Sequence, residues 1–271
     1  MEQLKRVTSA LIILPPLLCF LFFATREFFL ALVLLLAALS LREYFQMLAL
    51  CQYPAQPGVS YFLAFLIVCS AYLSATFWLP MTTFFALAML TVNAILTGQS
   101  AAQRFTALLH NLFGVFFIGW GLSHLVLLRN LPEGKWYILF LCAIVWIGDT
   151  LAMYVGKVIG RHKMSPSISP GKTWEGSAGG LIGGLITAVA LSSYLVPQLS
   201  LRQCLLLALL LSIMAQISDL GESMIKRYAG VKDSGELIPG HGGLLDRIDS
   251  LLFAAPAFVY TLRLLHHGFA F

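Results

Sequence analysis

Long apolar runs separated by short polar stretches form the dominant pattern of this chain. A helix needs about 20 largely apolar residues to cross a bilayer. Backbone groups cannot stay unpaired in lipid, and the sequence lacks the alternation typical of a membrane barrel, so the runs predict helices. We therefore expect an all-α, polytopic integral membrane protein with about nine transmembrane helices. The expected spans are 7–23, 28–41 (extending toward Leu50), 61–79, 81–97, 108–128, 136–153, 177–196, 201–217 and 251–265.

Composition agrees with this pattern and predicts an orientation. The chain is 59% hydrophobic and 11% charged, with a mean hydropathy of +0.86. Cytoplasmic loops of membrane proteins carry an excess of Lys and Arg. With the N-terminus in the cytoplasm, twelve of the 17 Lys and Arg residues fall inside and five outside. We therefore expect a cytoplasmic N-terminus and an external C-terminus.

Several other classes of protein are disfavoured. The first apolar run has a basic start but no small-x-small cleavage site, and it leads directly into another span, so we expect a retained helix rather than a signal peptide. The five cysteines form no CxxC pair, which disfavours a disulfide framework or a zinc site. The net charge of +5 suits a face that meets anionic lipid. No basic, aromatic-interleaved domain suggests a nucleic-acid partner.

Charge concentrates in the segment 218–250, which lies between two apolar runs. Asp246 and Asp249 are three residues apart, so on a helix they share a face, and Asp219 and Glu222 repeat this spacing. The glycines between the two pairs let a backbone approach a ligand closely. Carboxylates, glycines and nearby cations together suit a phosphate held through Mg²⁺. Each acidic residue alone could also lie in the first turn of a helix, where negative charge is favourable. The cations alone could be the usual cytoplasmic flank of a membrane span. Neither explanation covers the whole set.

A second polar region follows the sixth expected span. Asp149 lies near the end of this span, and we expect it to face a polar cavity, because a carboxylate at a helix centre facing lipid costs about 2.5–3.5 kcal/mol. Gly171-Lys172-Thr173 has the form of a P-loop tail, but Pro166 stands where the first glycine of that motif belongs, so the Walker interpretation fails. Glycines at positions 176, 180 and 184 then predict close packing of the next helix.

Residues 223–249 resemble the signature of the phosphatidate cytidylyltransferases, also called CDP-diacylglycerol synthases. The matching segments are SMIKR at 223–227, KDSG at 232–235, IPGHGGL at 238–244 and DRID at 246–249. The resemblance extends upstream to the surroundings of Asp149 and to the loop 169–176, in which Gly171 stands where Lys is frequent in that family. It covers most of the second half of the chain.

The resemblance implies transfer of the cytidylyl group of CTP to phosphatidate, with Mg²⁺ as the cofactor and a second cation left open. It also implies membrane lipid as a partner, a homodimer, and a bacterial-type inner membrane with the active site facing the cytoplasm. The expected organisation is an N-terminal transmembrane bundle, 1–128, and a catalytic region, 129–271, with cytoplasmic loops 154–176 and 218–250.

The same resemblance, together with the residue types, gives the expected site residues. The expected metal ligands are Asp219, Asp246, Asp249 and Asp149. The expected catalytic residues are Asp246, Asp249, Lys226, Arg227 and Lys232. The residues expected to bind substrate phosphates are Lys172, Ser169, Thr173, Arg247, His241, Gly242 and Gly243. Glu175, Glu222 and Asp233 are left as supporting or capping residues.

Two other functions stay open at this point. One is a related membrane CTP-dependent lipid kinase, acting on a polyprenol or phytol. The other is an anion transporter with charges lining a path. It is less favoured because the charges lie in two loops on the same side and no repeat between the halves is visible. CDP-alcohol phosphotransferases are excluded because the motif Asp-Gly-x-x-Ala-Arg is absent from the sequence.

Overall fold

The computed structural model describes residues 15–16, 18–51, 57–74, 76–97, 100–237 and 242–265. Nearly all of these residues are helical, and their only sheet is a hairpin of two short strands. Seven of the described helices are long and apolar enough to cross a membrane, and Pro57–Leu73 is a shorter apolar helix. The expected all-α, polytopic membrane fold is confirmed. Because the first expected span, 7–23, lies mostly outside the described residues, the count of nine spans and the cytoplasmic N-terminus stay predictions.

The chain forms two compact units. The first comprises Met1–Asn130 and Ala229–Arg247, and the second comprises Leu131–Tyr228 and Ile248–Phe271. The boundary at residue 130 lies close to the expected division, but a later segment of the chain returns to the first unit. Whether the two regions divide the function as expected stays a prediction.

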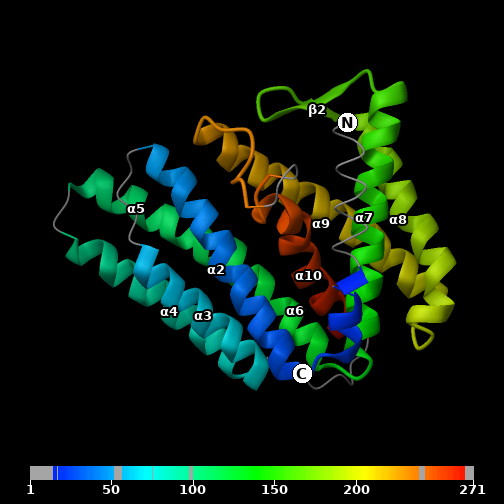
Figure 1. Cartoon of the computed structure of the whole chain (residues 1–271), viewed down its shortest axis with the longest axis horizontal. Coiled ribbons are helices and arrows are strands. Elements are labelled where there is room, and N and C mark those ends of the chain that lie inside the picture. The colour runs from blue at the N-terminus through cyan, green and yellow to red at the C-terminus, as the bar shows by residue number, and fades with distance from the viewer. Residues whose placement is uncertain are drawn as a thin grey trace. The chain divides into compact units, whose positions relative to one another are not determined.

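The part of the first unit that precedes residue 131 is built mainly from helices. Its elements are α2 (Arg26–Leu50), α3 (Pro57–Leu73), α4 (Trp78–Leu96), α5 (Ala101–Phe113), the π-helical η1 (Gly114–Trp120) and α6 (Gly121–Asn130). The last three form one continuous apolar helix, Ala101–Asn130. Helix α3 packs against α2, α4, η1 and α6 (Figure 1).

The expected break between the third and fourth spans is wrong by several residues. The break was placed at Leu79-Pro80-Met81, but α3 ends at Leu73 and α4 begins at Trp78. Pro80 therefore lies in the first turn of α4. A proline is tolerated there because the N–H groups of a first turn have no intrahelical acceptor.

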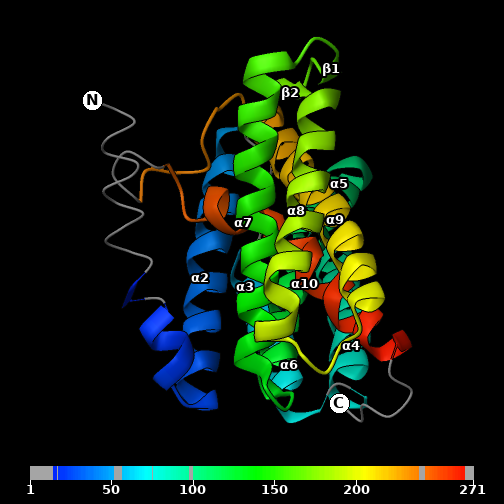
Figure 2. The same cartoon turned by 90° about the vertical axis from the view of Figure 1, so that its right-hand side faces the viewer.

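The second unit contains α7 (Gly134–Ile159), the strands β1 (Lys163–Ser165) and β2 (Ser169–Thr173), α8 (Trp174–Leu195), α9 (Leu201–Tyr228) and most of α10 (Leu245–Leu265). Helix α8 packs against both α7 and α9 (Figure 2). The expected glycine ridge lies at the contact between α7 and α8. A Cβ added at Gly180 would lie 3.0 Å from the Cβ of Ala152 and 3.2 Å from the carbonyl oxygen of Gly148. The prediction that this ridge serves close packing is confirmed.

Three helices extend beyond the apolar runs that predicted them. Helix α7 continues to Ile159, α9 continues to Tyr228, and α10 begins at Leu245. The expected loops 154–176 and 218–250 are therefore partly helical, and the first also contains the β1–β2 hairpin. Hydropathy detects only the apolar part of a helix, whereas Glu, Lys and Arg favour its continuation into water.

Candidate active site

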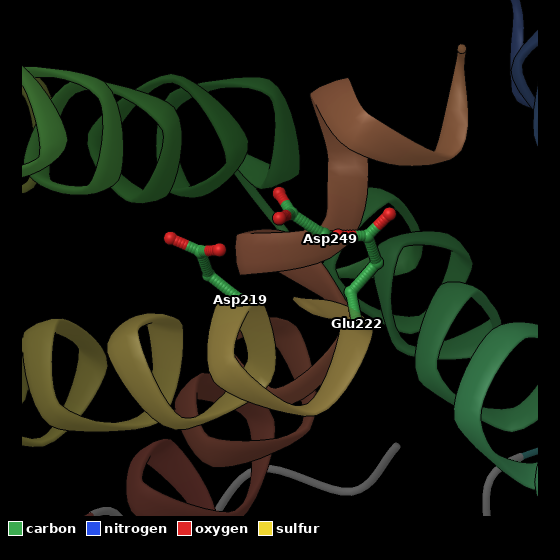
Figure 3. A group of neighbouring side chains, drawn as sticks. All are labelled: Asp219, Glu222 and Asp249. Atoms are coloured by element: carbon green, nitrogen blue, oxygen red, sulfur yellow. The ribbon is translucent and has the colours of Figure 1, made fainter. Parts of the chain in front are cut away.

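Three carboxylates meet in the second unit. Asp219 and Glu222 lie three residues apart on α9, so both side chains leave the same face of the helix. Asp249 comes from the first turns of α10 (Figure 3). Each of the three offers an oxygen within 4.8 Å of the others. We call Asp219, Glu222 and Asp249 the carboxylate cluster.

Burial makes the carboxylate cluster unusual. Glu222 is 0% exposed and Asp249 is 8% exposed, while Asp219 is half-buried. Like charges this close repel one another, and taking them out of water is costly unless cations compensate them. The site therefore needs positive charge close by.

Two lysines supply part of that charge. Lys226 lies one turn beyond Glu222 on α9 and forms an ion pair with it. Lys172 comes from β2, and its Nζ lies 2.7 Å from Oδ2 of Asp219. The β1–β2 hairpin thus brings a cation to the carboxylate cluster. The expected contact of Lys172 with a substrate phosphate stays a prediction.

The β1–β2 hairpin is fixed at both its tip and its base. At the tip, Nε of Arg227 donates to the carbonyl oxygen of Ile168 over 3.0 Å. At the base, the Trp174 N–H donates to the carbonyl oxygen of His162 over 2.9 Å. Thr173 is the N-cap of α8, and its hydroxyl accepts from the Gly176 N–H over 3.1 Å. The hairpin therefore holds Lys172 on two fixed supports.

Asp149 lies in the same unit on α7. The hydroxyl of Ser250, which follows Asp249 on α10, donates to Oδ2 of Asp149 over 3.2 Å. Asp149 also lines a small cavity together with Ser212 and Gln216. Asp149 therefore lines a cavity that includes polar side chains, while its role as a metal ligand stays a prediction.

Asp246 accepts three hydrogen bonds from residues of the first unit. Its Oδ2 accepts from the N–H of Ser234 over 2.9 Å, from the Ser234 hydroxyl over 3.0 Å and from the N–H of Gly243 over 2.9 Å. The carboxylate of Asp246 thus holds the loop that precedes α10, while that of Asp249 belongs to the carboxylate cluster. A single metal site formed by Asp246 and Asp249 stays a prediction, and the described geometry gives the two residues separate partners.

The remaining expected site residues are placed as follows. Arg227, Lys232 and Arg247 are exposed, Lys226 and Ser169 are half-buried, and Gly242 and Gly243 lie immediately before α10. Gly242 has a φ of +78°, in the left-handed region that favours glycine. His241 lies outside the described residues, so its phosphate contact stays a prediction.

Two residues were not expected in the site. Glu222 was left as a supporting residue, although its spacing from Asp219 was a usable signal. Glu43, on α2, had no expected role. It is 4% exposed, and its two oxygens accept from the N–H groups of Leu244 and Leu245, each over 2.8 Å. Nothing local in the sequence indicates these contacts.

The described helices define an all-α membrane protein, and the carboxylate cluster with Lys172 and Lys226 is its candidate site. A model of the cytidylyltransferase family matches residues 4–265, and the chain belongs to this family.

Curated relatives share the region of strongest similarity. The chain is 43% identical over 145 residues to the phosphatidate cytidylyltransferase of Staphylococcus saprophyticus, which covers 54% of this chain and 55% of the relative. It is 44% identical over 151 residues to that of Bacillus subtilis, covering 55% of each. The uncharacterized protein YnbB of Escherichia coli is 44% identical over 177 residues, 62% of this chain and 59% of the relative. The chain thus spans little more than half the length of the curated relatives it matches.

Proposed function

We propose that the protein transfers the cytidylyl group of CTP to phosphatidate and releases CDP-diacylglycerol and pyrophosphate. The observation that carries this proposal is the carboxylate cluster with its two lysines, set at the polar ends of helices in a membrane protein. Membership of the cytidylyltransferase family supports it, and so do the names of the relatives from Staphylococcus saprophyticus and Bacillus subtilis.

In this reaction a phosphate oxygen of phosphatidate attacks the α-phosphorus of CTP. The bond from that phosphorus to the bridging oxygen of the β-phosphate breaks, and pyrophosphate leaves with the electron pair. The attacking oxygen is already anionic at neutral pH, so it needs little help from a general base. The main barrier is the approach of one polyanion to another, which fixed positive charge lowers.

The carboxylate cluster fits a divalent cation of the magnesium type. All three donors are carboxylate oxygens, which Mg²⁺ prefers, and two of them are buried. When bound, the ion would neutralise phosphate charge and orient the reacting groups. Asp219, Glu222 and Asp249 would hold it. Asp149 and Asp246 remain further candidate ligands, and a second cation is also part of the proposal.

The cations of the site would bind the phosphates. Lys172 and Lys226 are the leading candidates, because each already lies against the carboxylate cluster. The other candidates for phosphate contact or catalysis are Arg227, Lys232, Arg247, Ser169, Thr173, His241, Gly242 and Gly243. We also propose that the site faces the cytoplasm from a bacterial-type inner membrane, and that the protein acts as a homodimer.

A double-label experiment tests the reaction. Purified protein in detergent micelles that contain both phosphatidate and a polyprenol is given CTP labelled on either the α- or the γ-phosphorus. Cytidylyl transfer puts only the α label into lipid and the γ label into pyrophosphate. A lipid kinase would put the γ label into lipid, and a transporter would produce neither; either result would overturn the proposal.

A further inference from the structure

A buried carboxylate on α2 holds the start of α10. Glu43 lies in the second half of α2, and its Oε1 and Oε2 accept from the N–H groups of Leu244 and Leu245. Leu245 is the first residue of α10 and Leu244 directly precedes it, and neither N–H group has an acceptor inside the helix. Leu244, which precedes the helix, has no side-chain oxygen to cap it. Glu43 therefore caps α10 from another helix.

The same carboxylate reaches the loop that carries the family signature. We call the described residues 231–237 and 242–244 the signature loop. The hydroxyl of Ser234 lies 3.0 Å from Oε2 of Glu43 and 3.0 Å from Oδ2 of Asp246. A hydroxyl has one proton, so Ser234 donates to one carboxylate at a time or shares its proton between them. Ser234 thus links Glu43 to Asp246.

Two glycines of the signature loop make room for this arrangement. A Cβ added at Gly235 would lie 3.0 Å from Oε1 of Glu43. A Cβ at Gly243 would lie 2.7 Å from the backbone nitrogen of Gly235, closer than real Cβ atoms come. Glycine is therefore required at Gly243 by the close approach of the loop to itself and to Glu43.

We propose that Glu43 is a positioning residue, which fixes the signature loop and the first turn of α10 so that Asp246 is held in its working conformation. The inference rests on the proposed function, in which Asp246 is a candidate catalytic and metal-binding residue. It assigns a role in the reaction to the N-terminal half of the chain, where the sequence showed little chemistry. A carboxylate suits this task better than a neutral group, because hydrogen bonds to charged acceptors are roughly twice as strong as neutral ones.

Hydrogen exchange of the backbone tests whether Glu43 holds the signature loop and the first turn of α10. Glu43→Gln keeps the size of the side chain but replaces one acceptor oxygen with a donor group. It can then accept from only one of Leu244 and Leu245. We expect exchange of a peptide covering 243–246 to become roughly tenfold faster. The matched control is Glu27→Gln on the same helix, whose exposed carboxylate accepts from the Tyr72 hydroxyl and should leave this peptide unchanged.

Kinetics separates positioning from general stability. In Glu43→Gln we expect kcat for CDP-diacylglycerol formation to fall roughly tenfold or more, because small misplacements of reacting groups are costly, while KM for CTP changes less. Glu43→Asp keeps both acceptor oxygens on a shorter stem, so it should recover more activity and more amide protection than Glu43→Ala. A lowered thermal midpoint with unchanged kcat in the folded fraction would instead mean a purely structural role and would overturn the inference.

A second variant keeps the test decisive if Glu43→Gln does not fold. Ser234→Ala removes only the link between Glu43 and Asp246, and we expect it to lower kcat and loosen the 243–246 peptide. Normal exchange and normal turnover in Ser234→Ala or Glu43→Gln would overturn the inference. A wild-type protein that makes no CDP-diacylglycerol would overturn the proposed function alone, and the exchange comparison would still decide whether Glu43 holds the loop.

Discussion

Lys172 and Asp219 form an ion pair, with 2.7 Å between Nζ and Oδ2, that joins the β1–β2 hairpin to α9. The two residues are far apart in the sequence, and the hairpin is the element that brings them together. A cation delivered to a carboxylate cluster in this way is available to a phosphate that binds there. Several predictions about the site depend on this arrangement.

The first prediction concerns Lys172. Lys172→Ala should lower the rate of cytidylyl transfer by about 10²-fold, because removing one group that stabilises charge in the transition state lowers the rate by about this factor. The side chains of this ion pair are 26% and 31% exposed, so the loss of stability should be about 1 kcal/mol or less. Steady-state kinetics and thermal unfolding of the same preparation measure the two effects.

The control for this variant is Lys135→Ala. Lys135 lies in the first turn of α7, where its Nζ is 5.6 Å from the ring centroid of Trp136. It should retain the wild-type rate. Equal, small effects in both variants would reduce the hairpin to a connector.

The second prediction is that substitutions of Asp219 and Glu222 both abolish turnover but differ in their effect on stability. Glu222 is fully buried and paired with Lys226, so Glu222→Gln should lower the free energy of unfolding by about 3–5 kcal/mol as well as abolish turnover. Asp219 is half-buried, so Asp219→Asn should lose turnover while unfolding near the wild-type temperature. Unfolding curves followed by circular dichroism measure this contrast. Two variants of equal stability would contradict the burial argument.

The third prediction concerns the metal. A ligand that binds only the folded state stabilises it, by about 2.7 kcal/mol at a hundredfold excess over Kd. Adding Mg²⁺ to protein treated with a chelator should therefore raise the unfolding temperature of the wild type. The rise should be absent from Asp219→Asn. A similar rise in both proteins would place the ion elsewhere.

The fourth prediction concerns topology. The excess of Lys and Arg on one side predicts that a reporter fused after Phe271 lies outside the cytoplasm. Paired fusions to alkaline phosphatase and to a fluorescent protein report on the two sides. A cytoplasmic reporter would mean that the number of spans is even rather than nine.

The sequence predicted most of the fold because the apolar runs are long and leave few alternatives. It also gave Asp219 and Asp249, two of the three members of the carboxylate cluster, as expected metal ligands. Glu222 was left as a supporting residue, although it lies one helical turn from Asp219. It misplaced the ends of α7, α9 and α10, because hydropathy is insensitive to the polar continuation of a helix. The break near Pro80 was misplaced because a proline can begin a helix as well as end one.

Contacts between distant residues could not be predicted from one sequence. Glu43 is separated from Ser234, Leu244 and Leu245 by 191, 201 and 202 positions. The sequence around Glu43 resembles that of any acidic residue near the end of a span. The spacing of Asp246 and Asp249 likewise suggested a shared site, yet Asp246 accepts from Ser234 and Gly243 before α10, whereas Asp249 meets two carboxylates of α9.

The separate partners of Asp246 and Asp249 give a fifth prediction. Metal ligands that act as a unit are not additive, so a double substitution within the carboxylate cluster, Asp219→Asn with Asp249→Asn, should be little worse than either single one. Asp246 accepts from the N–H groups of Ser234 and Gly243, so Asp246→Asn should speed hydrogen exchange of the 243–246 peptide. Asp249→Asn should leave that exchange rate unchanged. The same exchange rates in both single variants would mean that Asp246 and Asp249 have one common role.

The most direct measurement is the rate of CDP-diacylglycerol formation by well-folded Asp249→Asn. Asparagine keeps the size of the side chain and removes its charge, so the helix is retained while the buried carboxylate is lost. We predict that turnover falls below about one hundredth of the wild-type rate, with a thermal midpoint in the absence of Mg²⁺ at or above that of the wild type because repulsion within the carboxylate cluster is relieved. Near-normal synthesis of CDP-diacylglycerol by this variant would contradict a reaction centred on the carboxylate cluster.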